Sequence, residues 1–238
     1  MLSTLFAILY PGLRLALAAP AYAAAAYCPE NNNSPGTQLS CHVGNCPRVD
    51  AADTTTGLEF KNTPGTDTTG FVAIDRTDRL IVVGFRGTAS LLGWIIDFRF
   101  NRVPTTICDG CNAHQGCWDS WLSVEDVIFN TVKNAVAANP RFSVVCTGHS
   151  LGGAIASLAA ANLRNAGYNA TLYSFGAARF ADAALSDYIS NQPASNYQYY
   201  MTTPNFFPVN PADIRVCSGS LDRGCSAGWV WFDVISHV

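Results

Sequence analysis

Residues 144–163 read VVCTGHSLGGAIASLAAANL. The apolar, β-branched residues at the start are typical of a buried strand, and the alanine- and leucine-rich residues after them are typical of a buried helix. Gly148, Ser150 and Gly152 form a G-x-S-x-G motif where the two meet. In that setting the motif predicts a nucleophile elbow, a strained turn that lifts a serine hydroxyl out of a sheet. The alternative is an ordinary glycine-rich turn.

The segments around this motif predict an α/β fold with a central, mainly parallel sheet, because apolar strands alternate with helices. No linker divides these segments, so residues 21–238 are expected to form one domain. Helices are expected at residues 119–140 and 150–167, and strands at residues 70–77, 78–87, 141–149, 171–180 and 196–203, the first two as a hairpin.

Composition limits the function. The chain has 238 residues, of which 49% are hydrophobic and 13% charged, and its formal net charge is −3. This composition supports one substantial core and argues against global disorder. Because lysine and arginine form no cluster, nucleic acid is not expected as a partner. The sequence does not define an oligomeric state.

Residues 1–20 are expected to form a signal segment. The first 23 residues are apolar and contain no acidic residue, and small residues at Ala16 and Ala18 or at Ala21 and Ala23 suit cleavage. The alternative is a terminal helix that belongs to the fold. Since the apolar run is too short and too interrupted to span a membrane, we expect a secreted protein without a transmembrane anchor.

Nine cysteines include three close pairs, and each pair lies in a glycine-containing stretch, which favours loop disulfides made in an oxidising compartment. Zinc binding is the alternative, but only one two-residue spacing occurs and no second one completes a site, so no metal is expected. Cys146 lies in an apolar run and is expected to be a buried free thiol. The three pairs are Cys41 with Cys46, Cys108 with Cys111, and Cys217 with Cys225.

Ester hydrolysis by Ser150 would require two donors for the oxyanion that forms. The N–H of Leu151, directly after the serine, is one candidate. Thr88, which follows GFRG at the end of an expected strand, is the other. Arg86, in the same stretch, is expected to pair with a structural carboxylate.

These motifs resemble those of the secreted fungal class 3 lipases, the family of filamentous-fungal triacylglycerol lipases and feruloyl esterases. The resemblance implies an α/β-hydrolase fold with Ser150 as nucleophile and Thr88 as an oxyanion donor. It covers most of the chain beyond the first twenty residues, in family order, through AAAAYC (residues 23–28), GNCP (44–47), GFVAIDRTDRLIVVGFRGT (70–88), HQGCWDSW (114–121), VVCTGHSLGGAIASLAAANLRNAG (144–167), YSFGAARFAD (173–182) and IRVCSGSLDRGC (214–225).

Residues 89–100, ASLLGWIIDFRF, match the lid of that family. Leu91, Leu92, Trp94 and Ile95 are too many apolar groups for an ordinary surface loop. They predict a short helical lid that covers the site in water and turns toward a lipid surface. A simple buried helix is the alternative.

A serine nucleophile needs a base, and the chain has four histidines. His42 lies between two cysteines, His114 belongs to the HQGCW segment that the family uses structurally, and His149 directly precedes the nucleophile. His237, in the stretch FDVISHV, is therefore the expected base, and the resemblance places the family's histidine in a similar stretch.

Asp213 is the expected acid of the triad, because it follows the strand at residues 196–203 and precedes the base, as the order of this fold requires. The family's own acid position reads Phe206 here. Relatives also continue past the histidine to a last cysteine that would pair with Cys28, whereas this sequence stops at Val238. Weak activity and an unpaired Cys28 are therefore expected.

The sequence as a whole predicts a carboxylic ester hydrolase that needs no cofactor. Triacylglycerol at a lipid–water interface is the expected substrate, because the lid is apolar. Two alternatives remain open, a feruloyl-type esterase acting on aromatic cell-wall esters and a catalytically impaired relative that only binds lipid.

Overall fold

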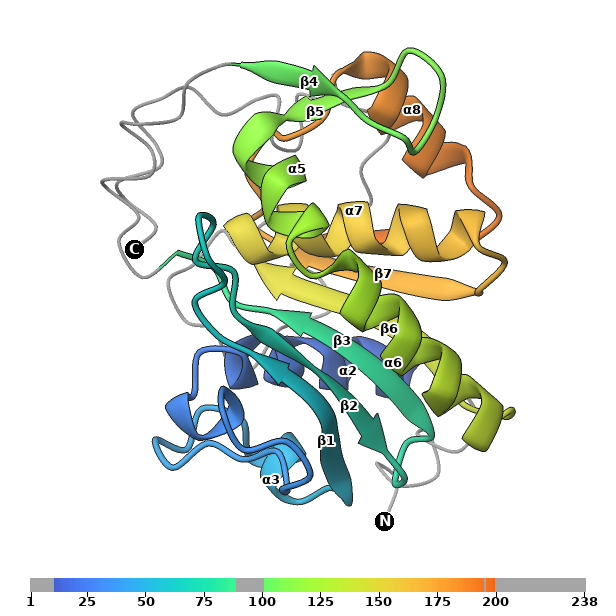
Figure 1. Cartoon of the computed structure of the whole chain (residues 1–238). Coiled ribbons are helices and arrows are strands. Elements are labelled where there is room, and N and C mark those ends of the chain that lie inside the picture. Colours follow the sequence, from blue (N-terminus) through green and yellow to red (C-terminus); the bar gives the residue numbers. More distant parts are fainter. Residues whose placement is uncertain (1–10, 89–100, 195, 200–238) are drawn as a thin grey trace.

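A six-stranded sheet forms the centre of the molecule, in the order β1-β2-β3-β6-β7-β8 (Figure 1). The computed structural model describes residues 11–88, 101–194 and 196–199. Its strands are β1 (Thr54–Phe60), β2 (Gly70–Asp75), β3 (Leu80–Phe85), β6 (Ser143–His149), β7 (Ala170–Phe175) and β8 (Asn196–Tyr199), with a separate pair β4 (Arg102–Pro104) and β5 (Asn112–His114). Its helices are α2 (Pro11–Ala25), the 3₁₀ turn η1 (Pro29–Asn31), α3 (Pro47–Asp50), α5 (Gln115–Leu122), α6 (Glu125–Ala138), α7 (Leu151–Asn165) and α8 (Ala183–Asn191).

The sheet is antiparallel at one side and parallel at the other. β1, β2 and β3 pair antiparallel, and β3, β6, β7 and β8 pair parallel. The register sets Phe85 beside Gly148 and His149 beside Phe175, so the carboxyl ends of β3, β6 and β7 meet at one edge. Loops that follow parallel strands at such an edge are where α/β proteins build their sites.

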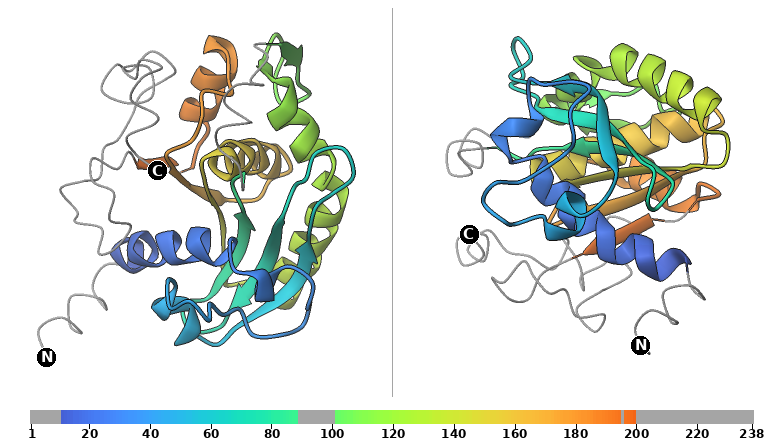
Figure 2. Two further views of the ribbon diagram at one scale, coloured as in Figure 1. Left: turned by 90° about the vertical axis from the view of Figure 1, so that its left-hand side faces the viewer. Right: turned by 90° about the horizontal axis from the view of Figure 1, so that it is seen from below.

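Side chains alternate between two hydrophobic cores, one on each face of the sheet. In β3, for example, Ile81 and Val83 join the core under α5, α6 and α7, whereas Leu80 and Val82 join the core under α2. A strand sends successive side chains to opposite faces, so strands buried on both faces read as continuous apolar runs. Figure 2 shows α2 (blue) on the opposite side of the sheet from α6 (yellow-green).

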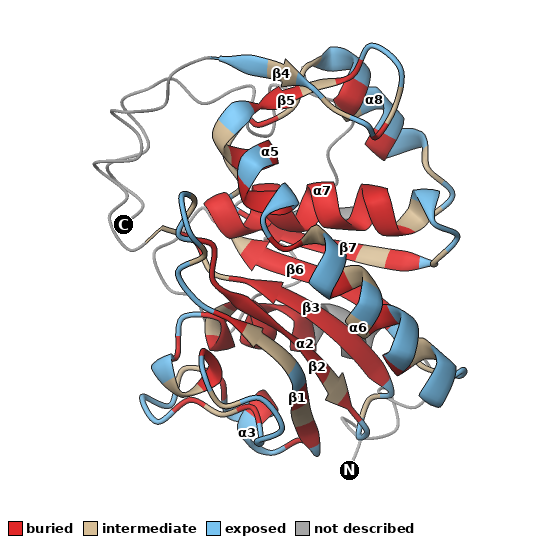
Figure 3. Cartoon of the chain, viewed as in Figure 1, coloured by how far each residue is buried: buried red, intermediate tan, exposed pale blue. Residues whose placement is uncertain are grey.

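Helix α7 is buried along nearly its whole length, from Leu151 to Leu163 (Figure 3). Its alanine- and glycine-rich sequence removes bulk on every side, which lets the helix lie close against the sheet and α5. Helix α6 buries a single stripe of Ile128, Val132 and Ala135 and is exposed on its other face. This difference in burial shows that α7 lies at the centre of the fold, directly after the elbow, whereas α6 lies at the surface.

Helix α2 belongs to the core of the described structure. Ala18, Ala19 and Tyr22 are at most 3% exposed. The Tyr22 hydroxyl donates to the Asp75 carboxylate, and the Thr147 hydroxyl donates to the Ala19 carbonyl oxygen at 3.4 Å. These contacts attach the helix to the β2–β3 hairpin and to β6.

Two expected elements differ from the structure. The helix expected at residues 119–140 is two helices, because Val124 leaves the helical conformation (φ −130°, ψ −2°) and the Ser123 hydroxyl donates to the Ser120 carbonyl oxygen at 2.8 Å. The strand expected at residues 171–180 ends at Phe175, because Gly176 adopts a left-handed φ of +52°. The hairpin at β2 and β3 and the strand–helix pair β6–α7 are confirmed.

Among the described residues, none of the helices combines the length and the apolar character that crossing a membrane would need.

Candidate active site

Ser150 stands between β6 and α7 in a backbone conformation that side chains rarely adopt, with φ 56° and ψ −124°. Such a conformation costs about 1–3 kcal/mol and persists only where the surroundings impose it. Here the Ser150 N–H donates to the Phe175 carbonyl oxygen at 2.9 Å, and the Ser150 carbonyl oxygen accepts from Gly153 N–H at 3.0 Å. The strained turn expected from the motif is present.

The two glycines of the motif are sterically required. A Cβ on Gly148 would lie 2.3 Å from the carbonyl oxygen of Gly152, and a Cβ on Gly152 would lie 2.3 Å from the carbonyl oxygen of Phe85. Both contacts are with backbone, which cannot move aside as a flexible side chain could. The elbow is therefore packed directly against the end of β3.

The end of β3 carries the second half of the site. A Cβ on Gly87 would lie 3.3 Å from the Cβ of Ser150, so the residue before Thr88 lies beside the candidate nucleophile. Thr88 is half-buried. The N–H of Leu151 is the first in α7 and has no acceptor within the helix, as in every helix N-terminus. The structure thus brings Ser150, Leu151 and the Thr88 loop together.

Tyr27 joins these two halves, and sequence reasoning did not identify it. Its hydroxyl lies 2.9 Å from Nδ1 of His149 and accepts from the Gly87 N–H at 3.1 Å. Burial raises the pKa of this phenol to about 12, so the group stays protonated and can donate to the imidazole. The AAAAYC segment carries part of the family resemblance. Nothing in the sequence, however, places its tyrosine beside Gly87 and His149, which lie 60 and 122 positions away.

The three described histidines have other contacts. Burial lowers the pKa of His149, which favours the neutral imidazole that accepts from Tyr27. His42 is exposed and lies 2.7 Å from the Glu30 carboxylate, and His114 is buried. Within the described ranges, the His149 imidazole contacts Tyr27 and the His42 imidazole contacts Glu30.

The other sequence-based candidates lie outside the described residues. These are the expected base His237, the expected acid Asp213, and the lid residues Leu91, Leu92, Trp94 and Ile95. Asp182, another carboxylate between Ser150 and His237 in the sequence, has a structural role, because its Oδ1 accepts from Leu185 N–H at 2.8 Å and caps α8. Arg86 lies 3.7 Å from the Asp67 carboxylate, which agrees with the structural pairing expected for it.

Comparison with known proteins identifies the family. The family model for class 3 lipases matches residues 82–212, more than half of the chain. The secreted mono- and diacylglycerol lipase A of Penicillium cyclopium is 37% identical over 232 residues, which covers 87% of this chain and 76% of that protein. This chain belongs to the class 3 lipase family.

Solved lipases share its fold. A mono- and diacylglycerol lipase from Aspergillus oryzae is 38% identical, with a TM-score of 0.83 and 92% of each chain covered. A triacylglycerol lipase whose catalytic centre is a serine protease triad is 25% identical, with a TM-score of 0.76 over 94% of this chain and 92% of that one. The expected α/β-hydrolase fold of this class 3 lipase is confirmed.

Two of the expected disulfides of the lipase, Cys41–Cys46 and Cys108–Cys111, are present in the structure. Cys146 is a buried free thiol, as expected. The third expected pair, Cys217 with Cys225, lies outside the described residues.

Proposed function

We propose that this class 3 lipase is a serine hydrolase that cleaves the ester bonds of acylglycerols. The observation that carries the proposal is the strained Ser150 turn, which lies at the start of α7 and beside Gly87 at the end of β3. That arrangement offers a nucleophile next to backbone donors for an oxyanion. A simple glycine-rich turn would not need the strain.

The proposed reaction follows the serine hydrolase scheme. The Ser150 hydroxyl attacks the ester carbonyl carbon while a base takes its proton, and the oxyanion accepts from the N–H groups of Leu151 and Thr88. The base returns the proton to the departing alcohol, and water then releases the fatty acid from the serine. We assign the base to His237 and the acid that orients it to Asp213, with residues 89–100 as the lid over the site.

The substrate proposal rests on the relatives. Two relatives at 37–38% identity are named mono- and diacylglycerol lipases, and a third at 25% is a triacylglycerol lipase. We therefore propose acylglycerols as the substrate class. Rates on emulsified monoolein, diolein and triolein will rank them, and faster hydrolysis of a feruloyl ester than of all three would overturn the lipid assignment.

The decisive experiment compares wild type with Ser150→Ala in p-nitrophenyl butyrate hydrolysis. The alanine variant should lose roughly 10⁴-fold or more in kcat, because the acyl-enzyme cannot form. Ser143→Ala, an exposed serine at the opposite end of the same strand, serves as control and should retain wild-type activity. Equal rates in wild type and Ser150→Ala would end the hydrolase proposal.

We further propose that the protein is secreted and that processing leaves Ala18 and the residues after it in place. The relative from Penicillium cyclopium is named as secreted, and disulfides suit an oxidising compartment. Cleavage after Ala23 would remove Ala19 and Tyr22 from the core under α2. The intact mass of protein recovered from culture medium should therefore correspond to a chain that begins at or before Ala18.

A further inference from the structure

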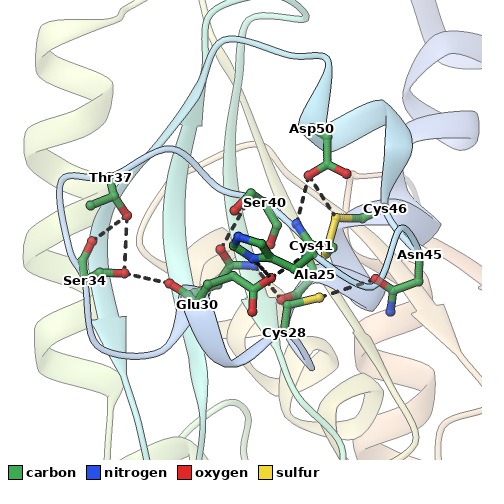
Figure 4. Close-up of polar contacts among 12 residues, drawn as sticks. Ala25, Cys28, Glu30, Ser34, Thr37, Ser40, Cys41, Asn45, Cys46 and Asp50 are labelled. Carbon is green, nitrogen blue, oxygen red and sulfur yellow. Dashed lines mark hydrogen bonds and ion pairs between the residues drawn. A yellow bond between two sulfur atoms is a disulfide. The ribbon is translucent and has the colours of Figure 1, made fainter.

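Three buried cysteines come together between the end of α2 and the loop before α3 (Figure 4). Their sulfur atoms all lie within 4.8 Å of one another, and Cys28, Cys41 and Cys46 are 2%, 4% and 0% exposed. Cys41 and Cys46 form a disulfide, and Cys28 is a free thiol. We call these three residues the cysteine triad. In this state it offers one thiol, which is too few ligands for a stable zinc site.

Polar contacts hold the Cys28 thiol at this place. It donates to the Asn45 side-chain oxygen at 3.4 Å, and Asn45 directly precedes Cys46 (Figure 4). A weaker contact at 3.8 Å runs to the Ala24 carbonyl oxygen. A free thiol is therefore held beside the loop that the disulfide closes.

Asp50 provides a partner for a released sulfur. Its Oδ1 accepts from the Cys41 N–H at 2.8 Å and lies 3.8 Å from Cys46 Sγ. A disulfide sulfur carries no hydrogen, so the second contact can be a hydrogen bond only when Cys46 is a thiol. The cluster thus contains an acceptor that only a released Cys46 would use.

We propose that the cysteine triad is an internal thiol–disulfide exchange site, in which the disulfide moves onto Cys28. The Cys28 thiolate attacks the sulfur of Cys41 or Cys46, a new S–S bond to Cys28 forms, and the Cys41–Cys46 bond breaks. The released sulfur takes up the proton that Cys28 gave up. The number of thiols and disulfides is unchanged, so no oxidant or reductant is required.

Charge and burial set the rate of this exchange. Burial and the charges of Glu30 from η1 and Asp50 from α3 raise the pKa of Cys28 to about 11, although the hydrogen bond to the Asn45 amide lowers it. The exposed imidazole of His42 contacts the Glu30 carboxylate and is the other titratable group next to this charge. With that pKa about 10⁻⁴ of the thiol is ionised at pH 7 and about 10⁻² at pH 9, so exchange should be roughly 100-fold faster at pH 9.

The products close longer loops than the starting disulfide does. Cys41 and Cys46 are 5 residues apart, whereas Cys28 precedes them by 13 and 18 positions in the sequence. In a flexible chain the longer loops cost more closure entropy, which disfavours these cross-links roughly three- to sixfold. In the folded protein that cost does not apply, because the fold already holds the three sulfur atoms within 4.8 Å of one another. The exchanged forms should therefore reach a measurable population once the thiolate is available.

The first test maps the disulfides of the wild-type full chain after incubation at pH 7 and at pH 9 without added oxidant. Thiols are alkylated in acid and denaturant, and the chain is cut after Glu30, which separates Cys28 from Cys41 and Cys46. Trypsin would not do so, because no lysine or arginine lies between Arg14 and Arg48. We expect fragments joined through Cys28 at pH 9, formed at a rate that is independent of protein concentration.

The second test counts thiols in single-cysteine variants. When Cys46→Ser and wild type are folded with oxidised glutathione as the oxidant, the remaining pair Cys28 and Cys41 of the variant should join, so its thiol count falls by one relative to wild type. In Cys111→Ser, the matched control, the count should rise by one, because no third cysteine lies near Cys108 in the described part of the chain. Both variants lose one native disulfide, so a general folding defect cannot produce opposite changes.

The proposal is overturned if Cys28 remains fully alkylated in wild type after hours at pH 9. A rise of one thiol in Cys46→Ser, equal to that in Cys111→Ser, would overturn it as well. Joined fragments whose formation rate rises in proportion to protein concentration would also overturn it, because such fragments come from exchange between molecules.

Discussion

Gly152 shows how a single hydrogen atom in place of a side chain sets the geometry of the site. Gly152→Ala would place a methyl group 2.3 Å from the backbone oxygen of Phe85 and force β3 away from the elbow. We expect a loss of about 1–3 kcal/mol in unfolding free energy, together with reduced ester hydrolysis. Urea denaturation and a p-nitrophenyl butyrate assay measure both.

Gly57→Ala is the matched control, because its new methyl group would meet Thr131 Cγ2 at 3.7 Å and the Val72 carbonyl oxygen at 3.8 Å, both ordinary contact distances. It should stay within about 0.5 kcal/mol of wild type. Equal losses in Gly57→Ala and Gly152→Ala would contradict the steric explanation.

Tyr27 is a positioning residue in this structure, because it acts through Gly87 and His149. Tyr27→Phe removes the acceptor of the Gly87 N–H and the hydroxyl at His149 Nδ1. A lost hydrogen bond that is only partly buried costs about 0.5–1.5 kcal/mol, so kcat should fall by up to roughly tenfold while KM changes little.

Tyr188→Phe removes a surface hydroxyl that contacts Asn165 at 2.8 Å and should leave kcat unchanged. A Tyr27→Phe enzyme with wild-type kcat would show that the bridge does not position the site.

At the scale of the element, α2 carries the core on one face of the sheet. Ala19 is 0% exposed, so Ala19→Asp would bury a carboxylate and should cost more than about 3 kcal/mol. Ala24→Asp, on the same helix at a half-buried position, should cost about 1 kcal/mol. Thermal unfolding followed by circular dichroism distinguishes the two variants. Equal melting temperatures for Ala19→Asp and Ala24→Asp would contradict the packing of α2 in the folded core.

The sequence predicts those elements that have a clear hydrophobic pattern. The elements that it does not predict have no such pattern. The runs of β3 and β6 are apolar on both faces, which identifies central strands. Strand β1 was missed because its sequence, TTTGLEF, is mostly polar at the sheet edge. Residues 1–20, which include the first part of α2, have the apolar and acid-free composition of a signal segment, and this composition does not show that the helix packs in the core.

The candidate site was predictable in part for the same reason. Ser150 and Thr88 follow apolar strands, so local pattern locates them. Tyr27 and the cysteine triad depend on contacts between segments distant in the sequence, which no local pattern encodes. The family resemblance supplied the assignments of His237 and Asp213, and these remain predictions.

At the scale of the whole molecule, half-buried His149 links stability to pH. Its folded pKa is lowered by burial, so below about pH 6.5 the unfolded chain takes up a proton that the folded chain does not. Unfolding free energy should therefore fall as pH drops from 7.5 to 5. Glu30 and Asp182, whose pKa values are also lowered, add a second loss only below about pH 4.

Urea denaturation at pH 7.5, 6.5, 5.5 and 5.0 measures the first window. His149→Gln removes the titrating imidazole and should flatten the curve between pH 7.5 and 5. An unchanged slope in that variant would assign the pH dependence to other groups.

The bridge from Tyr27 to His149 also has a consequence for biosynthesis. Tyr27 leaves the ribosome early. His149, and the Phe175 carbonyl that accepts from Ser150, follow it more than a hundred residues later. Domains fold as units when enough chain has emerged. The candidate site is therefore incomplete during most of translation. We expect ester hydrolysis only after the amino-terminal segment has packed against the strands that are synthesised late.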